Sequence, residues 1–299
     1  MLNSWQIGEF RVSSIVEYYG PTHDPAALFP SFERASFGEA AAQLPRGHYY
    51  SASDRLVIAI QIWLIEAGSR RILIDAGCGN GKSRRTARMH QLNSLWPEWL
   101  AAAGQSFNSI TDVVLTHLHS DHVGWNTRAE DGQWRPAFPN ARYHIPRDDY
   151  DFFRAAHSDG RIADGGSFAD SVEPVVAAGL VDFIVDEATV AGCLKVAPAP
   201  GHTPGQLNYW LESRGEHGVF SADVLHHAVQ VMRPDWNSAF CILPDEARRT
   251  RAGLLDEAAR TGALVMPCHF APPHAGYIRR MGRGFVFEPA GGPASSDYG

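Results

Sequence analysis

The stretch Leu115-Thr116-His117-Leu118-His119-Ser120-Asp121-His122-Val123-Gly124 decides how the rest of the chain is interpreted. Three histidines and one aspartate fall within six residues, directly after an apolar run that predicts a short buried strand. In an extended segment residues i and i+2 share a face, so His117 and His119 can reach the same point. A turn after His119 would send Asp121 and His122 to a neighbouring point. This geometry suits two metal ions a few ångströms apart.

Three further donor residues each follow a strand that the sequence predicts. His202 lies in a loop, residues 200–205, whose glycines permit a sharp turn and whose prolines stiffen it. Asp223 and His269 each come directly after a short apolar run. All seven side chains offer nitrogen or oxygen, which zinc and similar divalent ions accept. We therefore expect two divalent metal ions, with zinc favoured and iron, manganese or cobalt as alternatives.

Composition excludes several classes of protein. The 299 residues carry 26 lysines and arginines against 33 aspartates and glutamates, a formal net charge of −7, which argues against a nucleic-acid partner. The longest apolar run, Leu56 to Ile65, is too short for a membrane-spanning helix, which needs about 20 residues. The N-terminus has no signal-peptide pattern. The four cysteines form no CxxC pair, which indicates free thiols and a cytoplasmic protein.

Strand patterns and helix patterns alternate along the chain and predict one α/β domain over residues 1–299. A hairpin is expected around Ala67-Gly68-Ser69. The segment 21–53 is expected to be irregular and to form a lid or a dimer arm, and the tail 290–299 to be flexible. Helices are expected over Ser94–Ala103, Asp148–Ala156 and Pro244–Arg260.

The donor pattern resembles that of a known family. His117-x-His119-x-Asp121-His122, followed in order by His202, Asp223 and His269, is similar to the signature of the metallo-β-lactamase fold superfamily. The resemblance runs from about Arg11 to His269. It implies an αβ/βα four-layer sandwich, with two packed mixed β-sheets flanked by helices and the metals at one edge of the sheets.

The resemblance also implies a role for each ligand. His117, His119 and His202 would bind one metal, Asp121, His122 and His269 the other, and Asp223 would bridge both. Asp75 matches an acid that hydrogen-bonds a ligand histidine and fixes its tautomer. A bridging hydroxide would be the nucleophile, since two divalent ions lower the pKa of a shared water. Asp121 would also orient this hydroxide and pass a proton to the leaving group.

The stretch 222–230, continued to the helix that starts at Pro244, resembles the branch of quorum-quenching lactonases and methyl parathion hydrolase. This branch implies a dinuclear hydrolase that opens a lactone or cleaves a carboxylic ester, with a small hydrophobic substrate. Many of its lactonases carry a tyrosine three residues after the bridging aspartate, where this chain has His226. His226 either donates a hydrogen bond to the developing oxyanion or is structural. The expected pocket walls are aromatic: Trp125, Trp236, Phe240 and Phe270.

Other reactions use related sites and remain alternatives. A glyoxalase II-like thioesterase would use the same seven ligands, and the resemblance to the methyl parathion hydrolase branch keeps a phosphotriester hydrolase as a further alternative. A persulfide dioxygenase would use one iron and three ligands, so the retention of Asp121, His122 and His269 argues against it. The sequence leaves open the exact substrate, the native metal and whether the protein is a homodimer.

Overall fold

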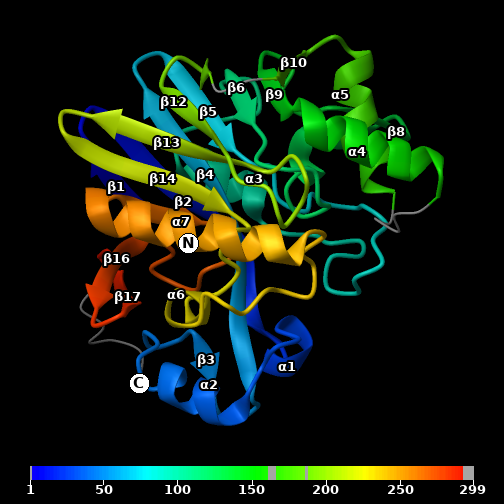
Figure 1. Ribbon diagram of the computed structural model, residues 1–299. Coiled ribbons are helices and arrows are strands. Elements are labelled where there is room, and N and C mark those ends of the chain that lie inside the picture. Colours follow the sequence, from blue (N-terminus) through cyan, green and yellow to red (C-terminus); the bar gives the residue numbers. More distant parts are fainter. Residues whose placement is uncertain (1, 161–165, 186–187, 292–299) are drawn as a thin grey trace. The chain divides into compact units, whose positions relative to one another are not determined.

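The computed structural model describes residues 2–160, 166–185 and 188–291. Figure 1 labels most of its helices and strands. The chain forms two compact units, each assembled from three separate segments. Unit 1 comprises Met1–Tyr18, Ile60–Pro198 and Thr203–Gly215, and unit 2 comprises Tyr19–Ala59, Ala199–His202 and Glu216–Gly299. The tail predicted to be flexible lies, from residue 292 onward, outside the described residues.

Unit 1 is built on a mixed β-sheet in the order β1-β2-β4-β5-β6-β9-β10. The pairs β1/β2 and β4/β5 are antiparallel, and β5/β6, β6/β9 and β9/β10 are parallel. The hairpin between β4 and β5 turns at Gly68, whose φ of 59° is a left-handed conformation that glycine adopts without strain, as the sequence predicted. The strands are β1 (Leu2–Ile7), β2 (Phe10–His23), β4 (Arg55–Ala67), β5 (Arg70–Ile74), β6 (Asp112–Val114), β9 (Arg142–Pro146) and β10 (Val181–Ile184).

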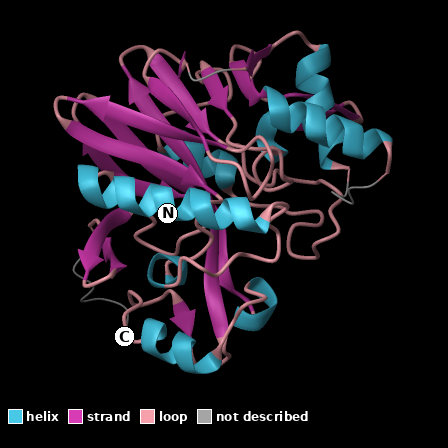
Figure 2. Ribbon diagram, viewed as in Figure 1, coloured by secondary structure: helices cyan, strands magenta, loops and turns pink. Residues whose placement is uncertain are grey.

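Helices cover one face of this sheet in unit 1 (Figure 2). Leu73 and Val113 of the strands pack in one apolar cluster with Trp96 of α3, Phe153 of α4 and Val175 of α5. The helices are α3 (Trp96–Ala102), α4 (Arg147–Ser158), η2 (Phe168–Val172), α5 (Glu173–Ala177) and the short turn η1 (Gly124–Asn126). The remaining strands are the antiparallel pair β7 (Thr127–Glu130) and β8 (Gln133–Pro136), and the antiparallel set β11 (Thr189–Val190), β12 (Leu194–Pro198) and β13 (Leu207–Ser213).

Unit 2 contains a second mixed group of strands and one long helix. β14 (Glu216–Ala222) runs parallel to β15 (Leu264–Pro267), and the strands β16 (Gly276–Met281) and β17 (Gly284–Pro289) continue antiparallel. Helix α7 (Pro244–Thr261) packs against β14 and β16 (Figure 1). The smaller elements are α1 (Pro25–Leu28), α2 (Arg34–Ala41), β3 (Tyr49–Tyr50) and α6 (Val229–Met232).

The predicted fold class is confirmed, since both units consist of mixed strands flanked by helices. All three predicted helices are present within two residues of their expected ends. The segment 21–53, expected to be irregular, instead contains α1, α2 and β3. The Asp24 carboxylate accepts from the Ala26 and Ala27 N–H groups and caps α1, and Phe29 and Phe37 anchor the segment in an apolar cluster with Trp236. Its role as a lid or arm and the single-domain assignment stay predictions.

No helix among the described residues is both long and apolar enough to cross a bilayer.

Candidate metal centre

Unit 1 holds Asp75 directly after β5 and the histidine-rich loop directly after β6. Asp75 is fully buried and has a φ of 62°, a left-handed conformation that is uncommon for a residue with a side chain. Its carboxylate accepts hydrogen bonds from the Thr116 N–H at 2.8 Å and the Thr116 hydroxyl at 2.9 Å. It also accepts from His122 Nδ1 at 2.9 Å. Asp75 therefore fixes the His122 ring and leaves its Nε2 as the nitrogen that can bind a metal.

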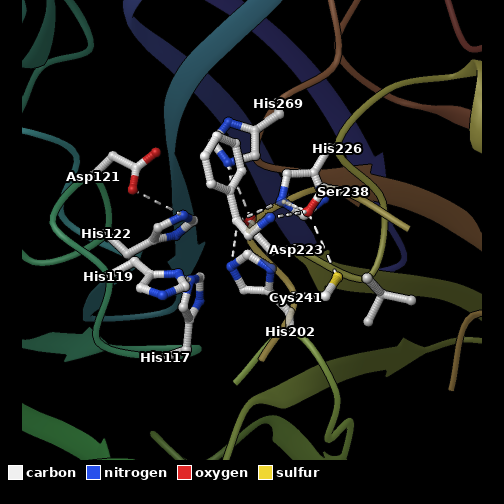
Figure 3. Close-up of polar contacts among 12 residues, drawn as sticks. His117, His119, Asp121, His122, His202, Asp223, His226, Ser238, Cys241 and His269 are labelled. Atoms are coloured by element: carbon white, nitrogen blue, oxygen red, sulfur yellow. Dashed lines mark hydrogen bonds and ion pairs between the residues drawn. The ribbon is translucent and has the colours of Figure 1, made fainter. Parts of the chain in front are cut away.

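The other donors of this loop are His117, His119 and Asp121 (Figure 3). Since the Thr116 hydroxyl donates to Asp75, its oxygen accepts from His117 Nδ1 at 3.0 Å, which leaves His117 Nε2 as a lone-pair donor. This nitrogen lies 3.1 Å from His119 Nδ1. Two nitrogens bound to one tetrahedral zinc would lie roughly 3.3 Å apart, given Zn–N bonds of about 2.0–2.1 Å. Asp121 Oδ1 lies 3.8 Å from His122 Nε2.

Unit 2 holds a second group of donors around the Asp223 carboxylate (Figure 3). His202 Nε2 and His269 Nε2 each lie 3.1 Å from an oxygen of Asp223. His269 Nδ1 donates to the carbonyl oxygen of Ala59 at 2.8 Å, so its Nε2 carries the lone pair. Asp223, His202 and His269 are all buried. A buried carboxylate facing two imidazole nitrogens fits a site that holds a divalent cation.

His226 lies beside Asp223 in the same unit. Its Nε2 is 3.3 Å from Asp223 Oδ2 and 3.3 Å from the Ser238 hydroxyl oxygen. Its Nδ1 has no hydrogen-bond partner among the described residues, so we place the proton on Nε2, which then donates toward Asp223. Burial lowers the pKa of His226 below its ordinary value, so the ring is neutral near pH 7. His226 is thus a neutral N–H donor aimed at the carboxylate of a predicted ligand.

Two acids of unit 1, the buried Asp149 and the partly buried Glu17, support the loops and were not identified from the sequence. The Asp149 carboxylate accepts from the Leu118 N–H at 3.0 Å and the Gly205 N–H at 2.8 Å, and burial raises its pKa to about 6. The Glu17 carboxylate accepts from the N–H groups of Cys78 and Gly79 and from the Trp125 indole, and burial raises its pKa to about 7. These contacts join residues 31 to 108 positions apart, so no local pattern signals them.

The four predicted pocket aromatics lie in different environments. Trp125 stacks on Trp96 in the core of unit 1. Trp236 and Phe270 are buried inside unit 2. Phe240 is 49% exposed, and its ring centroid lies 6.2 Å from that of His226. Of the four, Phe240 has the position of a wall beside a site, and the assignment of the others as pocket residues stays a prediction.

The seven predicted ligands therefore form two groups, each coherent within its own unit. Four lie on one loop of unit 1, and three lie at the loop 199–202 and at the ends of β14 and β15 in unit 2. The assignment of these groups to individual metals stays a prediction.

Comparison with known proteins identifies a family and several relatives. A family model described as "Metallo-beta-lactamase superfamily" matches residues 56–269. A curated relative, N-acyl homoserine lactonase AiiB of Agrobacterium fabrum (strain C58 / ATCC 33970), is 35% identical over 86 residues. That match covers 25% of this chain and only 31% of the relative.

Solved structures resemble the whole chain. A structure described as hydrolase AbOPH in the beta lactamase superfamily superposes with a TM-score of 0.81 and 22% identity, covering 97% of this chain and 98% of that one. AidC, described as a dizinc quorum-quenching lactonase in complex with a product, superposes with a TM-score of 0.78 at 22% identity and the same coverage. At these identities the likeness shows a shared fold.

Proposed function

The chain belongs to the metallo-β-lactamase superfamily, and we propose on that premise that it opens a lactone or cleaves a carboxylic ester with two bound divalent metals. The family confirms the predicted class of enzyme, a metal-dependent hydrolase. The reaction, the number of metals and the substrate are the proposal.

The observation that carries the proposal is the orientation of the imidazole rings. Three of them hold their Nδ1 in a hydrogen bond with a named partner: His117 with Thr116, His122 with Asp75, and His269 with the Ala59 carbonyl. Each ring therefore offers its Nε2 lone pair, as a metal ligand requires. A core histidine such as His274 also donates through Nδ1 to a carbonyl, but the Nε2 atoms of these three rings each lie beside another donor of the predicted ligand set. The donors fit divalent zinc, and we propose that both groups belong to one dinuclear centre.

The seven ligands would divide as the resemblance implies. His117, His119 and His202 would hold one cation, and Asp121, His122 and His269 the other, with Asp223 shared between them. When bound, two such cations supply a nucleophilic water of lowered pKa and polarise the carbonyl of the ester.

The chain's own residues would act on the nucleophile, the substrate oxygen and the leaving group. Asp121 is only partly buried, so its carboxylate can accept the proton of the nucleophile and deliver it to the departing oxygen. His226 would donate its Nε2 hydrogen to the carbonyl oxygen as negative charge develops there. Its lowered pKa keeps this ring neutral, so it donates without binding an extra proton.

The proposed substrate class rests on two observations. The curated relative AiiB and the structural neighbour AidC are both named as lactonases. In this chain the exposed ring of Phe240 lies next to His226 and offers an apolar wall for a hydrophobic acyl group.

Metal analysis of the purified protein combined with a substrate panel tests this proposal. The panel contains acyl lactones, aryl esters, a phosphotriester, a thioester and a β-lactam. We expect about two equivalents of metal, turnover of a lactone or ester, loss of turnover on chelation and recovery with added zinc. Turnover that survives complete metal removal would overturn the mechanism. Preferred turnover of the phosphotriester or the thioester would replace the proposed substrate class.

A further inference from the structure

Arg251 of α7 is a fully buried cation with an unusual set of partners. Its Nε donates to the carbonyl oxygen of Val224 at 2.9 Å, and its Nη1 donates to the carbonyl oxygen of Pro234 at 2.8 Å. Both terminal nitrogens donate to Asn237 Oδ1 at 3.1 Å. Burial lowers the pKa of the guanidinium only to about 10, so it is charged at neutral pH.

All of these partners are neutral. Among the residues that the structure describes, no carboxylate lies within ion-pair distance of the Arg251 guanidinium. Asp235 acts on the guanidinium only from beyond ion-pair distance. A buried charge without a direct counter-ion is costly, and an apolar side chain of similar length would fill the same space at a lower cost in free energy. Packing alone therefore does not account for an arginine at this position, whereas its hydrogen bonds to Val224 and Asn237 do.

The first of these groups belongs to the turn that carries Asp223. Val224, the acceptor of the Arg251 Nε hydrogen, is the next residue along the chain. The preceding residue, Ala222, has a φ of 45°, and the β14/β15 register shifts between Phe220 and Ala222. A left-handed alanine persists only where surrounding contacts determine it. The bond from Arg251 is one such contact, and it bears directly on the direction of the Asp223 side chain.

The second group belongs to the loop that contacts His226. Asn237 is fixed at both ends of its amide, since Oδ1 accepts from Arg251 and Nδ2 donates to the Pro244 carbonyl at 2.7 Å. The next residue, Ser238, places its hydroxyl oxygen 3.3 Å from His226 Nε2. Arg251 thus joins the turn of Asp223 to the loop that orients His226.

The same face of α7 also supports the loop that carries His202. The Thr250 hydroxyl donates to the Pro200 carbonyl at 2.6 Å. Gly201 packs so closely on the helix that an added Cβ would lie 2.2 Å from the Ala247 nitrogen. Ala247, Thr250 and Arg251 are three and four positions apart and therefore share one face of the helix.

We propose that Arg251 is a positioning residue of the metal centre, which sets the orientation of Asp223 and His226 by tying their two loops to α7. This inference deepens the proposed function and rests on it for the identity of the bound metal. It goes further by making a residue that contacts neither metal nor substrate a determinant of metal affinity.

Substitution of Arg251 with matched controls tests the inference. Arg251→Lys keeps the charge and loses the forked geometry, and Arg251→Met removes the charge. Arg260→Met is the control on the same helix, because Arg260 is exposed and its ion-pair partner within the described part of the chain is Glu257. Three quantities are measured: thermal stability, zinc affinity by competition with a chromophoric chelator, and the histidine ring nitrogens of metal-free protein by NMR.

We expect folded Arg251→Lys protein to bind zinc roughly 10- to 100-fold more weakly than wild type, the usual effect of losing a residue that orients a ligand. The ring signals of His202 and His226 should shift in the metal-free protein, and Arg260→Met should match wild type in all measurements. A lowered melting temperature with wild-type zinc affinity and unchanged ring signals would overturn the inference and leave Arg251 as a packing residue.

Asn237→Ala decides the question if the Arg251 variants do not fold. Weaker zinc binding by this variant supports the inference, and unchanged binding overturns it. Wild-type protein that binds zinc but hydrolyses no substrate would refute the proposed reaction while the zinc affinities still test Arg251. If wild type binds no zinc, the proposed centre fails, and the ring signals of metal-free protein decide the positioning role.

Discussion

A histidine ring binds a metal through one nitrogen, and the partner of its other nitrogen decides which one is free. Asp75 makes this choice for His122, and the Ala59 carbonyl makes it for His269. Asp75 also accepts two hydrogen bonds from Thr116, next to His117, so one carboxylate orders both sides of the ligand loop. Its effect on metal binding should therefore exceed that of an ordinary surface acid.

Asp75→Asn tests this role. Asparagine tolerates the left-handed backbone of Asp75, so the fold should be kept while one acceptor oxygen is replaced by a donor. We expect zinc affinity, measured by competition with a chelator, to fall about 10- to 100-fold. Asp182→Asn, an exposed acid paired with Arg142, is the control and should bind zinc as wild type does. Equal affinities for both variants would contradict the role assigned to Asp75.

His226→Ala tests whether the His226 ring acts on the substrate. If His226 donates to the carbonyl oxygen as charge develops, its removal should lower kcat by about 100-fold. Metal content should stay at the wild-type level, since His226 is a neighbour of Asp223 rather than a predicted ligand. Steady-state kinetics measures kcat, and metal analysis of the same sample measures the metal content. Unchanged turnover would remove His226 from the active site and leave it a structural residue.

At the scale of the element, α7 is the part of unit 2 that organises the loops. Pro244 opens the helix, Asp245 and Glu246 lie in its first turn, and Gly262 ends it in a left-handed conformation with a φ of 67°. These are the start and stop signals that made this helix predictable from sequence. Its inward face is less predictable, because an arginine normally indicates solvent and Arg251 is buried.

Gly262, which follows α7, and Gly253, which lies within it, give a paired prediction of opposite sign. Gly262→Ala forces a side chain into a left-handed conformation and should lower the free energy of unfolding by about 1 kcal/mol. Gly253→Ala lies within the helix and should raise it by about 0.5–1 kcal/mol. Neither added Cβ would touch another atom within 4 Å, so backbone conformation alone decides the sign. Urea denaturation measures both, and equal effects would show that the end of α7 is not left-handed in solution.

At the scale of the molecule, buried neutral histidines make unit 2 sensitive to acid. His227 Nε2 donates to the His48 carbonyl, and its Nδ1 accepts from the Val229 N–H, so the neutral ring is fully hydrogen-bonded. His274 Nδ1 donates to the Phe270 carbonyl. Burial lowers the pKa of both His227 and His274 to about 4.

The pH dependence follows from these pKa values. In the unfolded chain histidine has a pKa near 6.5, so between pH 6.5 and 4 the unfolded state binds protons that the folded state does not. The free energy of unfolding should therefore be intact above pH 6.5 and fall as the pH drops toward 4, by about 3 kcal/mol for each ring.

His227→Gln should make this acid loss shallower than in wild type, as measured by urea denaturation at pH 7.5, 5.5 and 4.5. His217→Gln is the control at a partly exposed position of the same unit and should follow the wild-type curve. The raised pKa of Glu17 acts in the opposite direction, but equally in all three proteins, so it cancels in the comparison. Parallel curves for wild type and His227→Gln would contradict the prediction.

The sequence by itself determined what short-range chemistry can encode. The ligand loop is predictable because four donors fall within six residues after a strand. Helix α7 is predictable because the residues that start and end it are local signals. The α/β class followed from the alternation of patterns. The helices of the segment 21–53 were missed because α1 is four residues long, and Phe29 and Phe37 anchor the segment on Trp236, about two hundred positions away.

Only the tertiary structure decided which residues hold the donors in place. Glu17, Asp149 and Arg251 are charged residues that a sequence would assign to the surface. Glu17 is partly buried and the other two are fully buried, and each hydrogen-bonds backbone groups far away in the chain. The physical reason is that a charge is costly to bury anywhere except where folding supplies several hydrogen bonds to it. Those hydrogen bonds come from turns that form only after the strands have paired, so no local sequence pattern predicts which charged residues will be buried.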